Sequence, residues 1–280
     1  MTKPLKTPAL KQFLPPIFFN QKEQWVRLKV MLNQIVQQLA PPILLDIAEA
    51  AAGFSQPKSS GQKALAPTDS TPLVQALEVY WNPKMAQALE TWGESTTWSE
   101  LEYLMVNCRG KVLDIACGTG KTIEILSRYR NIEVYGCDIS DFFVQKALER
   151  GIEPHRLQVC DATQTDYSDN FFDYAYSIGS LEHFTEDGIF QFVQESHRIT
   201  KYASFHMVPI SRLAQNEGWI HKFQSYYNNS TDWWLTKFKT SYDTVIVLDS
   251  AWQDRVSLGK WFVCIKEPNI KEPNSQPTDV

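Results

Sequence analysis

The segment VLDIACGTGKT, residues 112–122, constrains this chain most, because it joins a short apolar run to a turn with two glycines. The apolar run is typical of a buried strand. Gly118 and Gly120 lack a Cβ atom, so the main chain there can approach a ligand closely. An acid, Asp114, lies just before these glycines. The segment therefore predicts a strand, a ligand-binding turn and the start of a helix.

Strand patterns and helix patterns alternate after this turn. The strand patterns lie at 111–116, 132–137, 156–160, 171–178 and 202–208, and the helix patterns at 122–130, 141–150 and 187–200. This rhythm predicts an α/β fold with a doubly wound, mostly parallel sheet and helices on both faces. A further helix pattern, near 231–240, precedes strand patterns at 242–250 and 260–266. The gap between those two strands is too short for a helical crossover, which predicts an antiparallel pair.

The ends of the chain differ from this central domain, which we expect over residues 73–266. Residues 1–53 show apolar side chains at helical spacing and predict an N-terminal helical extension. Residues 54–72 are rich in proline, serine and glycine and predict a flexible linker. Residues 267–280 predict a disordered tail.

Composition limits the classes of partner. The net charge of −5 argues against a nucleic-acid binder, and the five histidines lack metal-ligand spacing, so no metal is expected. The five cysteines include no C-x-x-C pair, which favours reduced thiols and a cytoplasmic location. Residues 1–30 carry six basic side chains and one acid. A helical cap on the main domain and a peripheral membrane contact through residues 1–53 are both open interpretations.

The glycine turn fits neither of two common phosphate-binding loops. An ATPase loop needs a glycine where Ile115 stands, and a dinucleotide loop needs one where Ile123 stands. Both ligands carry phosphates, which Asp114 would repel. A ligand with an ammonium group and a carboxylate fits better, because Asp114 attracts the first and N–H groups opening the next helix receive the second. S-adenosylmethionine (SAM) is such a ligand.

Two more acids follow strands at the expected places. Asp138 ends the second strand, where an acid can accept hydrogen bonds from both ribose hydroxyls. Asp161 ends the third strand and can accept from the adenine amine, while Ile139 can pack on the ring. The fourth strand continues into SIGSLEHF, residues 177–184, at the edge of the sheet where ligands bind.

Four strings, VLDIACGTG, YGCDIS, VCDA and FDYAYSIGSLEHF, resemble in order and spacing the class I SAM-dependent methyltransferases. The resemblance implies a seven-stranded sheet of order 3-2-1-4-5-7-6 with its last strand antiparallel. It implies SAM as the cofactor, bound by Asp114, Ala116, Cys117, Gly118, Thr119, Gly120, Asp138, Ile139, Asp161, Ala162, Ser177 and Ile178. The chain departs from the family at Ala116, which replaces a glycine, and before the fifth strand, where RITKYASF lacks a Gly-Gly pair.

A methyltransferase needs a general base only if its acceptor must lose a proton. Residues at the strand ends that could act in this way are His183, Glu182 and His206. His183 titrates near neutral pH and could deprotonate a hydroxyl. The alternative is that His183 caps or packs the helix that begins near residue 185.

Aromatic side chains gather in two segments, 80–98 and 209–234, which we expect to form the acceptor pocket. Aromatic faces beside amides suit a sugar or another ring with hydroxyls, and LPPIFFN resembles the start of methyltransferases from bacterial surface-glycan gene clusters. The expected acceptor is a small or glycan-like molecule, with a lipid-linked sugar as one form, methylated at oxygen or nitrogen. Alternatives are a lipid C-methylating enzyme of the cyclopropane fatty-acid synthase type, which SIGSLEHF also resembles, a non-catalytic SAM-binding protein and an NAD-dependent oxidoreductase.

Overall fold

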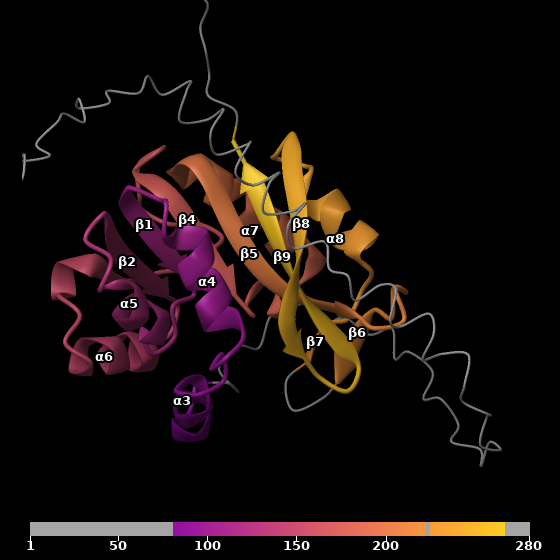
Figure 1. Cartoon of the computed structure of the whole chain (residues 1–280), viewed down its shortest axis with the longest axis horizontal. Helices are drawn as coiled ribbons and strands as arrows, with labels where there is room; N and C mark the ends of the chain where they lie inside the picture. The colour runs from indigo at the N-terminus through magenta and orange to yellow at the C-terminus, as the bar shows by residue number, and fades with distance from the viewer. Residues whose placement is uncertain (1–80, 222–224, 267–280) are drawn as a thin grey trace, which may run out of the picture. The chain divides into compact units, whose positions relative to one another are not determined.

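A seven-stranded sheet with helices on both faces organises the described part of the chain (Figure 1). The computed structural model describes residues 81–221 and 225–266. The predicted N-terminal extension, linker and C-terminal tail lie outside these residues. The helices within 81–221 and 225–266 are all too short or too polar to cross a membrane.

The strand order is β3-β2-β1-β4-β5-β9-β8. The strands are β1 (Gly110–Ile115), β2 (Ile132–Asp138), β3 (Leu157–Val159), β4 (Phe172–Ile178), β5 (Thr200–Ser211), β8 (Thr244–Gln253) and β9 (Ser257–Ile265). Strands β1 to β5 are parallel, and β9 runs antiparallel to both β5 and β8. This confirms the predicted order and the antiparallel last strand. A small hairpin of β6 (Trp219–His221) and β7 (Ser225–Tyr227) was not predicted.

The described α-helices are α3 (Pro83–Leu89), α4 (Thr97–Met105), α5 (Lys121–Leu126), α6 (Asp141–Glu149), α7 (Glu186–Ile199) and α8 (Thr231–Phe238), with short 3-10 turns η3 (Pro154–Arg156) and η4 (Leu181–His183). Four of them, α5 to α8, fall at the predicted places, whereas α3 and α4 were not predicted. Helix α5 is shorter than the predicted 122–130, because the Ser127 hydroxyl donates to the Glu124 carbonyl and closes the last turn at Leu126.

Polar side chains cap the start of four of the described α-helices. Asn82, Ser140, Thr185 and Ser230 precede α3, α6, α7 and α8, and each side chain accepts a hydrogen bond from a backbone N–H three residues ahead. Gly151 follows α6 with φ of 93°, a left-handed conformation that ends the helix without a Cβ clash. The N-caps fix where the preceding loops end, and Gly151 fixes where the loop after α6 begins.

The core lies on both faces of the central strands. The inner residues of β1 and β2 are buried almost without interruption, as parallel strands covered by helices require. Strand β8 at the sheet edge alternates between partly buried and exposed residues at its end. Because β1, β2 and β4 are parallel neighbours, their carboxyl ends meet at one edge of the sheet. The loops at that edge rest on the buried apolar residues of these strands.

Helix α4 is fixed to the far end of the sheet by one carboxylate. Glu100 accepts hydrogen bonds from the Trp261 indole N–H at 2.7 Å, the Ser250 hydroxyl at 2.7 Å and the Ala251 backbone N–H at 2.6 Å. Trp261 is buried in β9. This one side chain therefore holds α4, and with it the loop before α4, against β8 and β9.

We expect Glu100→Ala to lower the free energy of unfolding by about 2–3 kcal/mol, because it leaves the Trp261 indole N–H and neighbouring donors without their charged acceptor. Chemical denaturation followed by fluorescence measures this change. Glu149→Ala, which removes an exposed partner of Lys146, is the control and should leave the stability unchanged. Equal effects of the two substitutions would contradict the anchoring role of Glu100.

Candidate functional site

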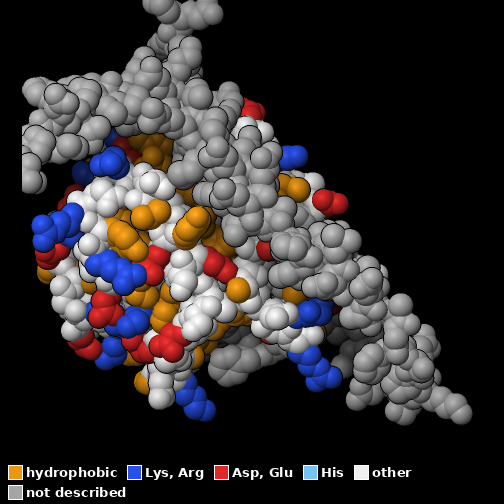
Figure 2. All heavy atoms as spheres, in the orientation of Figure 1, with side chains coloured by type: hydrophobic (Ala, Val, Ile, Leu, Met, Phe, Trp, Pro, Cys, Tyr) orange, Lys and Arg blue, Asp and Glu red, His pale blue; other side chains and the backbone are white. Residues whose placement is uncertain are grey.

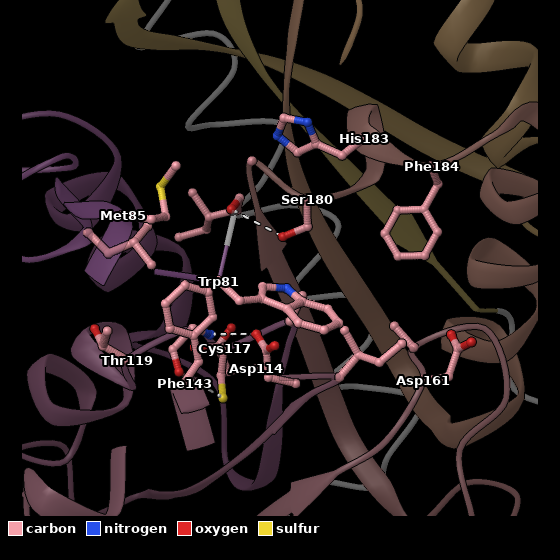
Figure 3. A pocket seen from close by; sticks show the side chains of 18 of the residues that line it. Trp81, Met85, Asp114, Cys117, Thr119, Phe143, Asp161, Ser180, His183 and Phe184 are labelled. Carbon is pink, nitrogen blue, oxygen red and sulfur yellow. Dashed lines mark hydrogen bonds between the residues drawn. The ribbon is translucent and has the colours of Figure 1, made fainter. Parts of the chain in front are cut away.

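A cavity of 570 Å³ opens at the carboxyl ends of β1, β2 and β4, the edge predicted to bind the ligand (Figure 3). The sheet contributes the loops after these strands, and α3, α4 and their connecting segment contribute an apolar wall. The predicted cofactor residues all line the cavity except Gly120 and Ser177. The structure thus brings together side chains from 114 to 178 that the sequence places on separate strands.

The turn after β1 is built from residues in left-handed conformation. Ala116, Gly118 and Gly120 have φ values of 60°, 53° and 73°. The Cys117 N–H donates to the Cys137 carbonyl at 2.9 Å, and the Gly118 N–H donates to Asp138 Oδ2 at 2.9 Å. The turn is therefore tied to the end of β2 by two hydrogen bonds and opens into α5.

The two glycines have different roles. A Cβ atom on Gly118 would lie 3.0 Å from Leu89 Cδ1, on the cavity side where α3 covers the turn. A Cβ atom on Gly120 would lie 2.5 Å from Ile152 Cδ1 and 2.9 Å from Ala147 Cβ. Gly118 thus permits close approach within the cavity, while Gly120, which was predicted to bind the cofactor, lets the turn pack against α6.

Asp114 lies at the end of β1 and is only 3% exposed. Its carboxylate accepts a hydrogen bond from the Thr122 hydroxyl of α5. Burial raises the pKa of Asp114 to about 7, and the nearby Asp138 adds to this rise. A buried acid with a raised pKa favours a cationic partner, so the carboxylate is suited to attract an ammonium group.

Asp138 combines a structural role with the predicted binding role. Its Oδ1 accepts from the Ser140 N–H at 2.9 Å, and its Oδ2 accepts from the Gly118 N–H. Burial raises the pKa of Asp138, while these backbone hydrogen bonds oppose the rise. Each carboxylate oxygen can accept more than one hydrogen bond, so ribose hydroxyls can still bind here.

The loop after β3 forms the far end of the cavity. Asp161 is exposed, and its Oδ1 accepts from the Thr163 N–H at 2.8 Å and from the Thr163 hydroxyl at 2.7 Å. Ile139 is 39% exposed although it is apolar, and Ala162 lies beside it in the lining. An exposed apolar side chain next to a carboxylate suits a flat heteroaromatic ring with an amine.

His183 and Glu182 lie on η4, directly after β4, and only His183 lines the cavity (Figure 3). His183 Nδ1 lies 2.8 Å from the Ser225 carbonyl of β7, so Nδ1 carries the hydrogen and Nε2 the lone pair. Glu182 is buried, with Oε1 3.8 Å from His183 Nε2. Burial lowers the pKa of His183 to about 4 and raises that of Glu182 to about 8. Both side chains are thus mostly neutral at pH 7.

The structure places His206 and Ser177 in the core rather than in the cavity. Both are fully buried, and the Ser177 hydroxyl lies 2.9 Å from His206 Nδ1. His206 Nε2 lies 2.8 Å from the Ser204 hydroxyl, and its ring stacks on Phe238. Burial lowers the pKa of His206 to about 3. The positions of these two side chains do not fit their predicted catalytic and cofactor-binding roles, because each points into the layer beside the sheet.

The two aromatic segments predicted to form the acceptor pocket also differ: one lines the cavity and the other lies in the core. Trp81, Trp92 and Trp98, all in the predicted segment 80–98, line the cavity. The described residues of the predicted segment 209–234 do not appear in the lining, and Trp219, Tyr226, Tyr227, Asn228, Asn229 and Trp234 are buried in the core. Large aromatic side chains are usually buried, and here that tendency determines their position.

Several lining residues had no sequence signal of their own. Met85 and Leu89 project from α3, Phe143 from α6, and Asp187 and Gln191 from α7. Their spacing of four along α3 and α7 is that of one helix face, but which face meets the cavity depends on how the helices pack. In residues 81–221 and 225–266, no group of three His, Cys, Asp or Glu side chains is arranged to hold a metal.

Comparison with known families and relatives agrees with this geometry. Residues 112–202 match the family model of a methyltransferase domain. Methyltransferase GfsG of Streptomyces halstedii is 33% identical over 37% of this chain and 40% of its own length. Mouse probable tRNA methyltransferase 9B is 35% identical over 31% of this chain and 19% of its own length. Wheat phosphoethanolamine N-methyltransferase 1 is 32% identical over 34% of this chain and 20% of its own length. The chain thus spans less than half the length of these relatives.

Solved structures share the fold. A Pyrococcus horikoshii protein superposes with a TM-score of 0.50 at 21% identity, covering 68% of this chain and 99% of that chain. A chain of the Haloferax volcanii complex that contains the Trm112 methyltransferase activator gives 0.55 at 14% identity, covering 69% of this chain and 99% of that chain. Identities this low support the shared fold and carry nothing further about activity.

The left-handed Ala116 provides a test of this turn. A side chain in that conformation costs about 1–2 kcal/mol, while a glycine loses about 0.4–1 kcal/mol more entropy on folding. We therefore expect Ala116→Gly to raise the free energy of unfolding by about 0.5–1 kcal/mol, measured by chemical denaturation. Ala162→Gly, at a lining alanine without positive φ, is the control and should lower it. A lower free energy of unfolding in both variants would contradict backbone strain at Ala116.

Proposed function

Since residues 112–202 form a methyltransferase domain with the class I SAM-dependent fold, we propose that this protein transfers a methyl group from SAM to an oxygen or nitrogen of a small-molecule or glycan-like acceptor. The main support is the convergence of Asp114, Asp138 and Asp161 on one cavity beside the Gly118 turn. Those carboxylates lie at the ends of β1, β2 and β3, in the order of the three parts of SAM that each was predicted to bind.

The residues of the cavity fit SAM. Asp114 would hold the ammonium group, the open backbone at Gly118 would receive the carboxylate end, and Asp138 would accept from the ribose hydroxyls. Ile139 and Asp161 would take the adenine ring and its amine. When bound, SAM supplies an electrophilic methyl group that an acceptor oxygen or nitrogen takes by in-line displacement.

His183 is positioned to act as the base for a hydroxyl acceptor, although its lowered pKa makes it a weaker base than an exposed imidazole. It is neutral at pH 7, and the Ser225 carbonyl holds the Nδ1–H, so Nε2 can accept the proton that the acceptor oxygen loses. In the cyclopropane-type enzymes that SIGSLEHF resembles, the corresponding glutamate helps to hold a bicarbonate base. Here Glu182 is buried and does not line the cavity, which makes that alternative less favourable. We therefore favour O-methylation.

The charges of the cavity disfavour an acidic acceptor. The charged lining residues among those described are Asp114, Asp138, Asp161, Asp187 and Lys121. Four acids against one lysine would repel a phosphate-bearing acceptor, such as the names of the tRNA and phosphoethanolamine relatives suggest. Lys, Arg, Asp and Glu side chains are also interspersed on the described part of the face in Figure 2. Trp81, Trp92 and Trp98 offer ring faces that suit a sugar or an aromatic ring with hydroxyls.

One experiment separates this function from its alternatives. Labelled SAM is incubated with the protein and a cell extract, which is then divided into lipid, glycan, small-molecule and protein fractions. We expect label in a small-molecule or glycan fraction. Label in lipid alone supports the C-methylating alternative, and SAM binding without transfer supports a non-catalytic role. A separate calorimetric titration with S-adenosylhomocysteine (SAH) and with NADH tests the remaining alternative. Binding of NADH without binding of SAH would identify an oxidoreductase.

Binding of SAH should depend on the protonation of Asp114. The pKa of about 7 means that the free protein holds a proton there below neutral pH, and only the ionised form attracts the ammonium. Affinity should therefore rise by about tenfold between pH 6 and pH 7.5, as measured by calorimetry. Asp114→Asn should bind weakly and lose this dependence. The control Asp161→Asn should keep it, and an identical pH profile in wild type and Asp114→Asn would contradict the role of Asp114.

His183→Ala should reduce transfer of label by about 10²- to 10⁴-fold, because the acceptor hydroxyl loses its base. The affinity for SAH should stay within about twofold, since His183 is not among the groups proposed to hold the cofactor. His155→Ala, at an exposed histidine on η3, is the matched control and should transfer at the wild-type rate. Transfer by His183→Ala at that same rate would rule out His183 as the base.

A further inference from the structure

Arg150, directly after α6, connects three elements around the cofactor side of the cavity. Its Nε donates to the Thr119 carbonyl in the glycine turn at 3.0 Å. One terminal nitrogen donates to Glu124 Oε2 of α5 at 2.7 Å, and the other donates to Glu90 Oε1. The Arg150 side chain is only 14% exposed although it carries a permanent charge. A guanidinium group is suited to such a role, because its donors point in fixed directions.

Glu90 brings α3 into this arrangement. It is the C-cap residue of α3, and its Oε1 also accepts a hydrogen bond from the Thr119 hydroxyl at 3.0 Å. Thr119 and Arg150 therefore hold the same carboxylate oxygen from two sides. Thr119 is itself only 2% exposed and lines the cavity. The end of α3 is thus attached to the turn that surrounds the cofactor site.

Helix α3 forms part of the cavity wall just before this attachment. Met85 and Leu89 line the cavity, and Leu89 Cδ1 would lie only 3.0 Å from a Cβ atom on Gly118. The contact leaves little space between α3 and the glycine turn. Any outward movement of α3 would open the cavity at the place where the turn meets the proposed ligand.

We propose that Glu90 and Arg150 are positioning residues, which hold α3 closed against the turn at Thr119 and so set how long the cofactor stays bound. This inference rests on the proposed function, because it takes the cofactor to be SAM or SAH. Neither side chain lines the cavity. Both act through the backbone and side chain of Thr119 and through the placement of Met85 and Leu89.

The chain provides a matched control for this role. Glu90 and Glu124 are both paired with Arg150, and their side chains are similarly exposed, at 38% and 47%. Only Glu90 belongs to the end of α3, whereas Glu124 lies within α5, next to the turn. Glu90→Gln and Glu124→Gln therefore each remove one carboxylate from Arg150. Only the first weakens the attachment of α3, and the second also removes the partner of Lys121.

The first experiment measures SAH dissociation from the full chain by stopped-flow tryptophan fluorescence, with Trp81, Trp92 and Trp98 in the cavity wall as reporters. We expect Glu90→Gln to release SAH about fivefold faster than wild type, which corresponds to about 1 kcal/mol. Glu124→Gln should release it within about twofold of the wild-type rate. Thermal unfolding should be the same in both variants, so that a global loss of stability is excluded.

A second experiment tests the position of α3 without any ligand. Amide hydrogen exchange of residues 85–92 should be faster in Glu90→Gln than in Glu124→Gln, because the helix opens more often when its attachment is lost. Equal exchange and equal SAH release in the two variants would overturn the proposal. If the wild type fails to bind SAH, the proposed function is wrong, while the exchange of residues 85–92 still decides whether Glu90 holds α3.

Discussion

The hydrogen bond between the Gly118 N–H and Asp138 is the interaction on which the site depends. It ties the left-handed turn after β1 to the end of β2, so the two loops cannot move independently. The Cys117 N–H, bonded to the Cys137 carbonyl, reinforces this link one residue earlier. The φ of 60° at Ala116 is unfavourable on its own, and the parallel strands below the turn provide the support.

Burial shifts the pKa values of the acids and of the histidine in and next to the cavity in opposite directions. It raises the pKa values of Asp114 and Glu182 and lowers that of His183, so at pH 7 this part of the protein carries less charge than its composition suggests. A cavity with poorly solvated carboxylates gains most from a ligand that brings a positive charge. A neutral imidazole, in turn, can accept a proton without first having to lose one.

Much of the fold, and the gathering of Asp114, Asp138 and Asp161 at one cavity, could be predicted from the sequence, since both depend on local patterns. Alternating apolar runs determined the strands, and acids directly after strands had to gather at one edge once the sheet was parallel. His206 shows why the catalytic residues and the acceptor pocket were harder to predict. Its position at a strand end suggested catalysis, but the orientation of a side chain on β5 depends on register, and the register points it toward Phe238. The aromatic residues of 209–234 were predicted to line the acceptor pocket, but several are buried in the core. Burial of a tryptophan depends on neighbours far away in sequence, which local patterns do not show.

The hydrogen bond between His183 and the Ser225 carbonyl joins two parts of the chain that lie 42 residues apart in sequence. His183 belongs to the stretch matched by the methyltransferase domain model, whereas Ser225 lies beyond it, in the β6–β7 hairpin. Hairpins of this kind tolerate insertion and exchange more readily than the strands of a parallel sheet. A shift of the backbone at Ser225 would therefore turn the His183 imidazole while leaving Asp114, Asp138 and Asp161 in place, so the two ends of the cavity can change separately.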